Sequence, residues 1–296
     1  MSSLALKRLN QVYNSAAYIP LDYRSKFIIM SDCHRGIGNW GDNFAHNQNV
    51  YFAALSHYYK KGYTYIELGD GDELWENRSY DLIIETHNNV FWLLSKFQDN
   101  DRLYMLYGNH DIVKRNSSYI KKVCTSKNNP CEKNDITLFN CIKFYEGLIL
   151  YNKYNNQEIF LTHGHQADLF NDIFWRLSRF LVRYLWRPLE LVGFKNPTST
   201  ANNLSKRSKV ELNLIKWVEK NDIIMVTGHT HKPAFPAKGE SLYFNDGCSI
   251  HPRCITGIEI CQGQISLTKW STLVDPNNKL YIGRTTLEGP KELQNL

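Results

Sequence analysis

The stretch KFIIMSDCH, residues 26–34, joins a short apolar run to a polar turn that carries Asp32 and His34. The apolar run predicts a buried β-strand over residues 26–30. Such a strand places a carboxylate and an imidazole together at its carboxyl end. Cys33 lies between the two, and strand alternation predicts that its side chain turns away from them and packs inside.

The same design recurs twice further along the chain. In order, the expected elements are a helix near 44–61, a strand at 63–68, a helix near 81–98 and a strand at 102–107. The second strand ends at Gly69-Asp70 and the third at Gly108-Asn109. This βαβαβ order predicts parallel strands whose polar carboxyl ends share one edge of the sheet, where ligands bind in open α/β sheets.

The second half of the chain reads as short strands interrupted by helices. Further strands are expected at 148–151, 158–162, 222–227, 241–245, 255–261 and 264–270. Asn155-Asn156 marks a hairpin turn between the first two of these. A largely helical stretch at about 168–220 separates them from the rest, and Pro188 should end or kink its first helix. Because no Pro/Gly/Ser-rich linker occurs, we expect one domain, 1–296, with a helical cap inserted at about 166–221.

Composition places the chain among ordinary globular proteins. It has 296 residues, 43 % hydrophobic and 22 % charged, and a net charge of +6 that suits an anionic substrate. The amino-terminal stretch lacks the apolar run of a signal peptide, and no stretch approaches the roughly 18 apolar residues of a membrane span. Seven cysteines without a C-x-x-C pair argue against a disulfide framework and a zinc ribbon. A cytoplasmic location is the simplest expectation.

Five segments combine a strand end with a turn rich in metal-ligating side chains. They are Asp32-Cys33-His34, Gly69-Asp70, Gly108-Asn109-His110-Asp111, His163-Gly164-His165 and Gly228-His229-Thr230-His231. One such turn alone is more often a hydrogen-bonded turn than a metal site. Five of them, each at a strand end, are difficult to explain by turn chemistry. Carboxylate, imidazole and amide ligands together suit Mn, Fe or Zn rather than Ca²⁺ or Mg²⁺.

The ordered set D-x-H, G-D, G-N-H-D, H-G-H and G-H-T-H, over about residues 26–250, resembles the calcineurin-like metallophosphoesterase superfamily. The resemblance implies an α/β sandwich of two mixed sheets flanked by helices. It also implies two divalent transition-metal ions and attack of a metal-bound hydroxide on the phosphorus of a phosphate ester or anhydride. The ligands that it assigns are Asp32, His34 and His231 for one ion, Asn109, His163 and His229 for the other, and Asp70 between them. It assigns protonation of the leaving oxygen to His110, with Asp111 orienting that ring.

Within the superfamily, a helical insertion between H-G-x and G-H-T-H is similar to the UDP-2,3-diacylglucosamine pyrophosphatase branch. That branch usually has arginine where this chain has His110 and an acid where it has His165. A phosphorylated small-molecule substrate, nucleotide-linked or lipid-linked, is therefore the leading hypothesis. A protein phosphatase, a cyclic-nucleotide phosphodiesterase and a nuclease stay open, although a nucleic-acid partner is not expected. A non-catalytic interaction module would be expected to lose ligands, and none is missing.

Several residues beside the motifs are candidate substrate contacts. Arg35 is a candidate for pairing with a phosphate, and His165 is a candidate substrate contact or outer ligand. Asp72 and Glu73 follow Asp70 closely and could orient the metal ligands, although a solvated turn is the simpler interpretation of both.

The insertion carries an arginine stripe, Arg176, Arg179, Arg183 and Arg187, at spacings of one helical face. Trp175 and Trp186 flank it. A solvated basic face is the simplest interpretation. The alternative is a lid in which Arg176, Arg179 and Arg183 contact the substrate phosphate and apolar side chains contact a lipid or a nucleobase. Such a helix could also rest on a membrane surface, which would make the protein membrane-peripheral. The sequence leaves the oligomeric state open.

Overall fold

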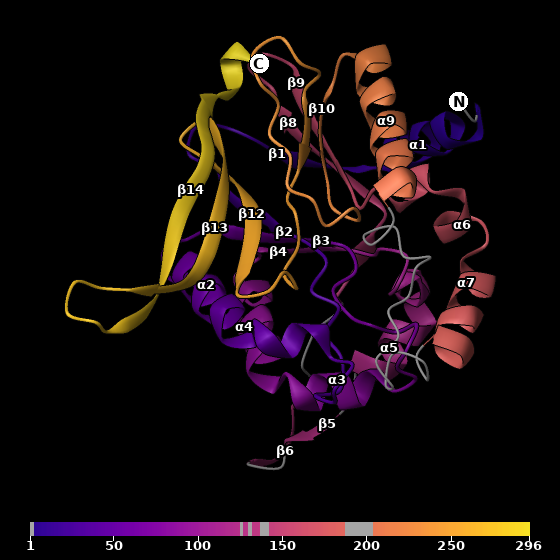
Figure 1. The fold of residues 1–296 in the computed structure, drawn as a ribbon, viewed down its shortest axis with the longest axis vertical. Coiled ribbons are helices and arrows are strands. Elements are labelled where there is room, and N and C mark those ends of the chain that lie inside the picture. Colours follow the sequence, from indigo (N-terminus) through magenta and orange to yellow (C-terminus); the bar gives the residue numbers. More distant parts are fainter. Residues whose placement is uncertain (1–2, 125–126, 130–131, 137–141, 187–203) are drawn as a thin grey trace.

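Two β-sheets packed face to face form the centre of the computed structural model, which describes residues 3–124, 127–129, 132–136, 142–186 and 204–296 (Figure 1). The larger sheet runs in the order β14 (Leu280–Glu292), β13 (Gln264–Val274), β12 (Cys254–Cys261), β2 (Lys26–Met30), β3 (Thr64–Leu68), β4 (Leu103–Leu106) and β7 (Phe144–Tyr145). The smaller runs β1 (Ala17–Pro20), β8 (Gly147–Asn152), β9 (Gln157–Thr162), β10 (Ile224–Thr227) and β11 (Tyr243–Asn245).

Both sheets are mixed. Strands β2, β3, β4 and β7 run parallel, whereas β12, β13 and β14 are antiparallel to their neighbours. In the smaller sheet β8 and β9 form the expected antiparallel hairpin, and the other pairs are parallel. The predicted α/β sandwich of two mixed sheets is therefore confirmed. A separate small hairpin consists of β5 (Lys127–Asn129) and β6 (Glu132–Ile136).

Helices cover the outer faces of both sheets. Helices α2 (Gln48–Lys60), α3 (Tyr80–Thr86) and α4 (Asn88–Gln98) lie on the larger sheet, and α1 (Ser3–Ser15) and α9 (Leu204–Asn221) on the smaller (Figure 1). The remaining helical elements are η1 (Asn43–His46), η2 (Ile112–Arg115), α5 (Ser117–Cys124), η3 (His165–Ala167), α6 (Leu169–Asp172), α7 (Trp175–Leu181), η4 (Val182–Trp186) and η5 (Leu293–Asn295). No helix in these described ranges is both long and apolar enough to cross a membrane.

The central strands are buried along almost their whole length because sheet or helix covers each face. Strand β10 is buried at every position, and β2 and β3 at every position but the first. Continuous apolar runs are typical of such strands. Ile29 of β2 pairs with Ile66 of β3, and both pack between the sheets. The core thus fixes the register that brings the ends of β2, β3 and β4 to one edge.

Most expected elements occur close to their predicted positions. The strand at 26–30 has the predicted bounds, and the helix expected near 81–98 is divided at His87 into α3 and α4. Helix α1 and strands β1 and β14 were not predicted. The turn that was to end the first cap helix, at Pro188, lies outside the described residues.

The region expected to form the cap divides into two parts. Helix α9 packs on the smaller sheet, and its fully buried Trp217 lies against Phe160 of β9. It therefore belongs to the outer helical layer. Helix α7 and the π-helical segment η4 bury none of their residues fully. In the described part of the predicted cap, only this α6–η4 segment lies off the sandwich, at its side (Figure 1).

Candidate metal centre

The loops that follow β2 and β3 run side by side beyond the ends of their strands. The backbone N–H groups of Asp32, His34 and Arg35 donate to the carbonyls of Gly69, Asp70 and Gly71, at 3.1, 2.9 and 3.0 Å. This ladder holds the first two ligand-bearing turns against each other. It explains why residues about 35 positions apart in the sequence share one site.

Five of the predicted ligands adopt a left-handed backbone conformation. They are Asp32, His34, Asp70, His229 and His231, with φ between 47° and 65°. A non-glycine residue in this region costs of order 1–3 kcal/mol and typically occurs at functional sites. Gly108 serves a different need, because a Cβ there would lie 2.2 Å from Oδ1 of Asp70. The turns are thus strained and tightly nested.

The first group of ligand atoms gathers around Asp32. Its Oδ1 lies 3.0 Å from Nε2 of His231 and 3.6 Å from Nε2 of His34. The two imidazole nitrogens are 3.3 Å apart. Since two Nε2 atoms and a carboxylate oxygen point to one place, a cation there would meet three ligands at once.

The second group gathers around Asp70. Its Oδ2 lies 3.2 Å from Nε2 of His163 and 3.8 Å from Nε2 of His34, a member of the first group. The ligand atoms of Asp70, His163 and His229 lie within 4.8 Å of one another. Asp70 therefore stands between the two groups.

The unsatisfied atoms of this region fit metal ions. Oδ1 of Asp32, Oδ1 of Asn109, Nε2 of His163 and Nε2 of His229 are buried and have no hydrogen-bond partner in the described part of the chain. Buried polar atoms rarely stay unpaired. Nδ1 of His163 donates to the carbonyl of Leu68 at 2.9 Å, so Nε2 carries the lone pair whenever the ring is neutral. The residues present thus fit transition-metal ions, and Asp32 and Asp70 would supply the carboxylates.

His110 lies beside both groups and is held by contacts with Asp70, Trp75 and Glu73. Its backbone N–H donates to Oδ1 of Asp70 at 2.8 Å, and its ring stacks on Trp75 with centroids 4.2 Å apart. Nδ1 of His110 lies 2.7 Å from Oε2 of Glu73, and Nδ1 of His34 lies 2.8 Å from the same oxygen. One carboxylate therefore orients a candidate metal ligand and the candidate acid together.

A sequence comparison identifies the family. The profile of the calcineurin-like phosphoesterase family matches residues 25–233, more than half of the chain. The chain belongs to this family. Among curated proteins, none matches the sequence.

Solved structures similar to this calcineurin-like phosphoesterase chain include Vps29 from Chaetomium thermophilum. The similarity covers 90 % of this chain and 97 % of that one, at 8 % sequence identity and a TM-score of 0.39. The same protein complexed with the RaPID-derived cyclic peptide RT-D3 gives 8 % identity, the same coverages and a TM-score of 0.36. These values are too low to bear on activity.

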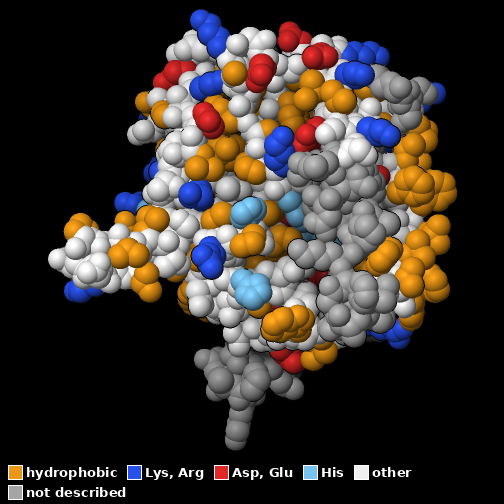
Figure 2. All heavy atoms as spheres, in the orientation of Figure 1, with side chains coloured by type: hydrophobic (Ala, Val, Ile, Leu, Met, Phe, Trp, Pro, Cys, Tyr) orange, Lys and Arg blue, Asp and Glu red, His pale blue; other side chains and the backbone are white. Residues whose placement is uncertain are grey.

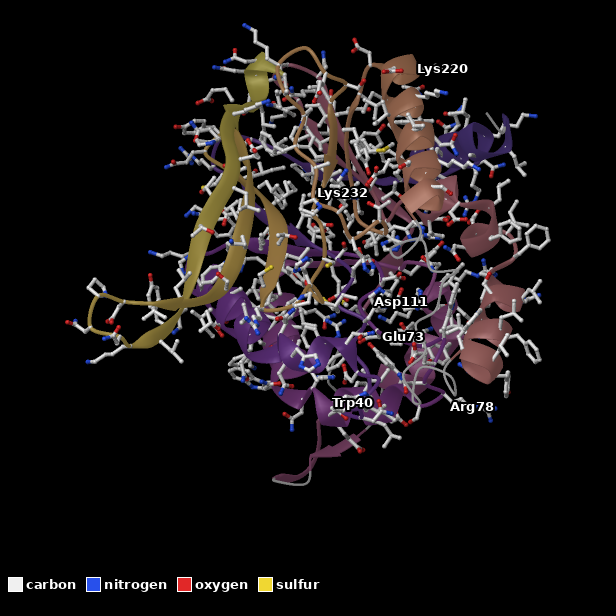
Figure 3. All side chains as sticks on the ribbon, in the orientation of Figure 1. Trp40, Glu73, Arg78, Asp111, Lys220 and Lys232 are labelled. Carbon is white, nitrogen blue, oxygen red and sulfur yellow. The ribbon has the colours of Figure 1, made fainter. Side chains whose placement is uncertain are left out.

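Two acidic residues of this calcineurin-like site differ from their predicted roles. Glu73 was expected in a solvated turn, but it is buried (Figure 3). Burial opposes its ionisation, but His110 and His34 outweigh burial and lower the pKa of Glu73 to about 2. Asp111 was expected to orient His110. Its carboxylate instead accepts from the backbone N–H of Gly108 and from Lys114, both at 2.7 Å. Glu73 therefore contacts the His110 ring, and Asp111 stabilises the turn that carries it.

Arg35 also differs from its expected role as a phosphate contact. It is fully buried, with its guanidinium paired to both oxygens of Glu67 and, through Nε, to Asp72 at 2.7 Å. Nζ of Lys114 joins Asp72 to Asp111. Asp72 is thus a buried partner of two cations rather than a solvated turn residue. The network lies beneath the ligand loops and has no exposed member.

His165 is fully buried beside His163, with ring centroids 5.4 Å apart. Neither of its ring nitrogens has a hydrogen-bond partner among the described residues, and Nε2 lies 3.8 Å from Oδ1 of Asp172. Burial, together with His163 and His229, holds its pKa well below the usual value, so the ring is neutral. The geometry thus places it behind the ligands, and its predicted substrate contact stays a prediction.

The arginine stripe divides into two sets. Arg176 and Arg179 stack on Trp175, at 5.5 and 4.9 Å from its ring centroid. Arg183 donates instead to the backbone carbonyls of Trp75 and Leu74. Contact of Arg176 and Arg179 with a phosphate stays a prediction, whereas Arg183 has a defined partner in the protein. Arg187 lies outside the described residues.

Sequence reasoning missed several members of the site. Ser31 lies between Asp32 and Asp246, with its hydroxyl 2.5 and 2.7 Å from their carboxylates. Asp246 follows β11 in an Asn-Asp-Gly turn, so it had the same strand-end signal as the other ligands. Asp168 lies 3.6 Å from Nε2 of His229. No periodicity or motif in the sequence marks Asp168 or Lys114.

Replacing Lys114 by methionine tests the buried network. The variant leaves Asp72 and Asp111 without their shared cation, and breaking a buried pair typically costs about 3–5 kcal/mol. Urea denaturation of the metal-free protein should show a loss of that size. The matched control is Lys96→Met, whose pair with Asp99 is exposed, and which should change stability by less than about 0.5 kcal/mol. Equal losses in the two variants would contradict the assigned role.

Proposed function

We propose that this chain is a two-metal phosphoesterase that hydrolyses a phosphate ester or pyrophosphate. The observation that carries the proposal is the convergence of two ligand groups on Asp70, with His110 beside them. Asp32, His34 and His231 would hold one ion, and Asn109, His163 and His229 the other. Mn, Fe or Zn suits this mixture of carboxylate, imidazole and amide.

The metal ions, when bound, would supply Lewis acidity and an activated water as nucleophile. The chain itself supplies the acid. Glu73 accepts a hydrogen bond from Nδ1 of His110 and so orients Nε2, which would give a proton to the leaving oxygen. Trp75 stacks on one face of the same ring and limits its rotation. About a fifth of the His110 side chain is exposed, so a substrate oxygen can approach it.

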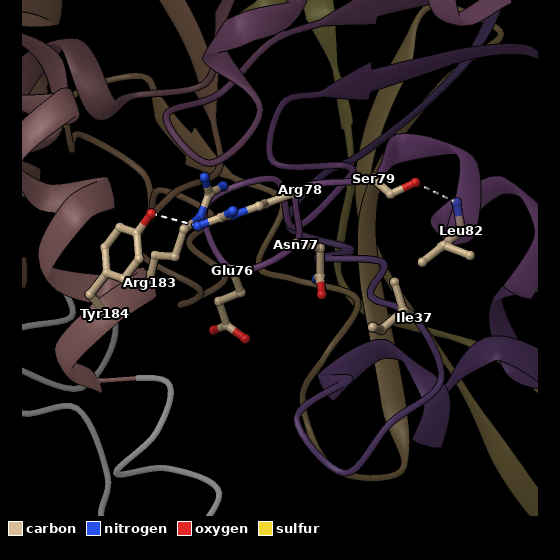
Figure 4. Close-up of a pocket in the computed structure, with 8 residues that line it drawn as sticks. All are labelled: Ile37, Glu76, Asn77, Arg78, Ser79, Leu82, Arg183 and Tyr184. Carbon is tan, nitrogen blue, oxygen red and sulfur yellow. Dashed lines mark hydrogen bonds between the residues drawn. The ribbon is translucent and has the colours of Figure 1, made fainter.

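A nucleotide-linked or lipid-linked pyrophosphate is the substrate class that we favour. The resemblance to the UDP-2,3-diacylglucosamine pyrophosphatase branch supports it, as does a cavity of about 360 Å³ between the loop after Trp75 and the cap (Figure 4). Its walls combine apolar, polar, cationic and anionic side chains: Ile37, Glu76, Asn77, Arg78, Ser79, Leu82, Arg183 and Tyr184. Such a mixed lining suits a ligand with both a charged and an apolar part.

The cap would also bring the enzyme to a membrane surface from the cytoplasm. Its exposed face carries Phe170, Ile173, Phe174, Leu177, Phe180, Leu181 and Leu185, all at least 40 % exposed. Figure 2 shows hydrophobic side chains gathered along the edge of the molecule where α6 and α7 lie. Apolar patches of this kind mark interaction sites, and the adjoining arginines suit anionic lipid.

Metal analysis tests the centre. After reconstitution with Mn²⁺ and removal of free metal, the wild-type chain should hold two ions. Asp70→Asn should hold one or none because its carboxylate stands between both groups. Asp99→Asn, at an exposed position between α4 and β4, is the matched control and should keep two. A wild-type chain that binds a single ion would overturn the two-metal assignment.

Substitution of His110 tests the chemistry. His110→Asn should lower kcat/KM for substrates with poor leaving groups by about 10²–10⁴ and lower it much less for 4-nitrophenyl esters. Metal content should stay at the wild-type value because His110 is not an assigned ligand. The assay uses phosphomonoesters, phosphodiesters and nucleotide-sugar pyrophosphates with Mn²⁺. Equal losses for all leaving groups would exclude His110 as the acid, and a wild-type chain inactive on every class would favour an interaction module.

Vesicle binding tests the cap surface. Phe174 and Leu177 are each more than half exposed, and replacing both by Asp removes apolar area from the centre of the face. Cosedimentation with vesicles of phosphatidylcholine and phosphatidylglycerol should fall by about tenfold or more, given roughly 1.5–3 kcal/mol for each buried side chain. Leu280→Asp, on the distant β13–β14 hairpin, should bind as the wild type does. Unchanged binding of the double variant would remove the membrane role from this face.

A further inference from the structure

Polar side chains of the cap contact the loop that follows Glu73, next to the candidate acid. Arg183 of η4 donates from Nε to the carbonyl of Trp75 and from Nη2 to the carbonyl of Leu74, both at 2.7 Å. Tyr184 adds a second tie, since its hydroxyl accepts from Arg78 at 2.6 Å (Figure 4). Through Arg183 and Tyr184 the cap therefore contacts the loop that follows Glu73.

This loop is the support of His110. Glu73 holds Nδ1 of the ring, and Trp75 covers one of its faces. The backbone N–H of Trp75 also donates to Oε1 of Glu73, at 3.2 Å. A shift of the Leu74–Trp75 backbone would consequently move the stacking ring and the carboxylate together. His110 has no other side-chain hydrogen bond within the described residues.

We propose that Arg183 is a positioning residue for the general acid, acting through Trp75 and Glu73 on His110. The proposal rests on the proposed phosphoesterase function and deepens it. It gives the cap a second role besides surface contact, because a ligand in the cavity that Arg183 lines would touch the residue that holds the acid. Binding of the substrate beside the cap would then change the position of the His110 ring.

The two hydrogen bonds explain why this position suits arginine. A guanidinium presents two parallel N–H groups in a rigid plane, so it can fix two successive carbonyls relative to each other. A lysine ammonium carries its three N–H donors on one nitrogen at the end of a flexible stem, so it would hold the two carbonyls less rigidly. The two donors that hold these carbonyls are not available to a substrate phosphate, the contact that the lid alternative in the sequence gave to Arg183.

The first experiment separates acid catalysis from the rest of the reaction. A series of aryl phosphate esters of the class that the wild-type enzyme hydrolyses is assayed with Mn²⁺. Arg183→Met should lower kcat/KM about tenfold or more for the phenyl ester and less than about threefold for the 4-nitrophenyl ester, which needs little acid assistance. Arg183→Lys should restore part of the loss. A uniform loss across the series would contradict the proposal and point to substrate binding.

A double variant then asks whether Arg183 acts through His110. If it does, adding Arg183→Met to His110→Asn should cost less than about twofold more, because the group being positioned is already gone. Additive losses would show that Arg183 works by another route and would overturn the inference. The proposed function fails in a different way: the wild type would then lack activity, or His110→Asn would lack any leaving-group effect.

Arg102 provides a matched control. It donates to the carbonyls of Tyr59 and Tyr63, at 3.2 and 2.9 Å, at the opposite end of β4 from the ligand turn. Arg102→Met removes an equivalent arginine–carbonyl contact and should leave the leaving-group dependence unchanged.

Nuclear magnetic resonance gives a readout that needs no turnover. With ¹⁵N-labelled histidine, the ring signals of His110 in the metal-free protein are assigned from their loss in His110→Asn. Arg183→Met should shift or broaden those signals, and Arg102→Met should not. Unaltered His110 signals in Arg183→Met would overturn the positioning role.

Discussion

The site depends on a set of buried ion pairs beneath the loops that follow β2, β3 and β4. Asp72 accepts from both Arg35 and Lys114, and Lys114 joins it to Asp111. Arg35 follows β2, Asp72 follows β3, and Asp111 and Lys114 follow β4, so each of the three loops contributes to one buried network. Removing one partner would leave a buried charge uncompensated, so the loops can hardly move independently. Fixed loops are the condition for placing ligands from distant parts of the sequence around one point.

This fixation accounts for the backbone strain at the ligands. Five non-glycine ligands occupy the left-handed region, which the surrounding structure must impose because isolated residues avoid it. In the metal-free chain the strain adds to the cost of crowding carboxylates and imidazoles. Burial opposes protonation of His163, but Asp70 and Asp32 outweigh it and raise its pKa to about 9. A bound cation would relieve this crowding, so metal binding and stability of the loops should be linked.

The strand-end ligands could be predicted from the sequence because the signal is local: an apolar run, a glycine and a ligand within a few residues. The partners of these ligands could not. Glu73 looks like a solvated turn residue until His34 and His110 are brought to it from both sides, and Arg35 looks like a phosphate contact until Glu67 is seen beside it. Lys114 gives no signal at all. Which polar residue is buried is decided by tertiary contacts, which single-sequence patterns do not contain. Asp246 differs from these residues, because the Asn-Asp-Gly turn after its strand is visible in the sequence and could have marked it as a member of the site.

The geometry of the cap could not be predicted from the sequence either. Arg176, Arg179 and Arg183 fall on one stripe if the helix is regular, which led to a single role for all three. The chain instead changes from α-helix to a π-helical turn at Val182–Trp186. A π-helical turn alters the register of the residues after it and frequently occurs at functional sites. Here Arg183 and Tyr184 face the loop after β3, whereas Arg176 and Arg179 stay on Trp175. The irregular turn therefore separates an outer basic surface from an inner contact. On the proposed function, one short segment would meet a surface on one side and support the acid on the other.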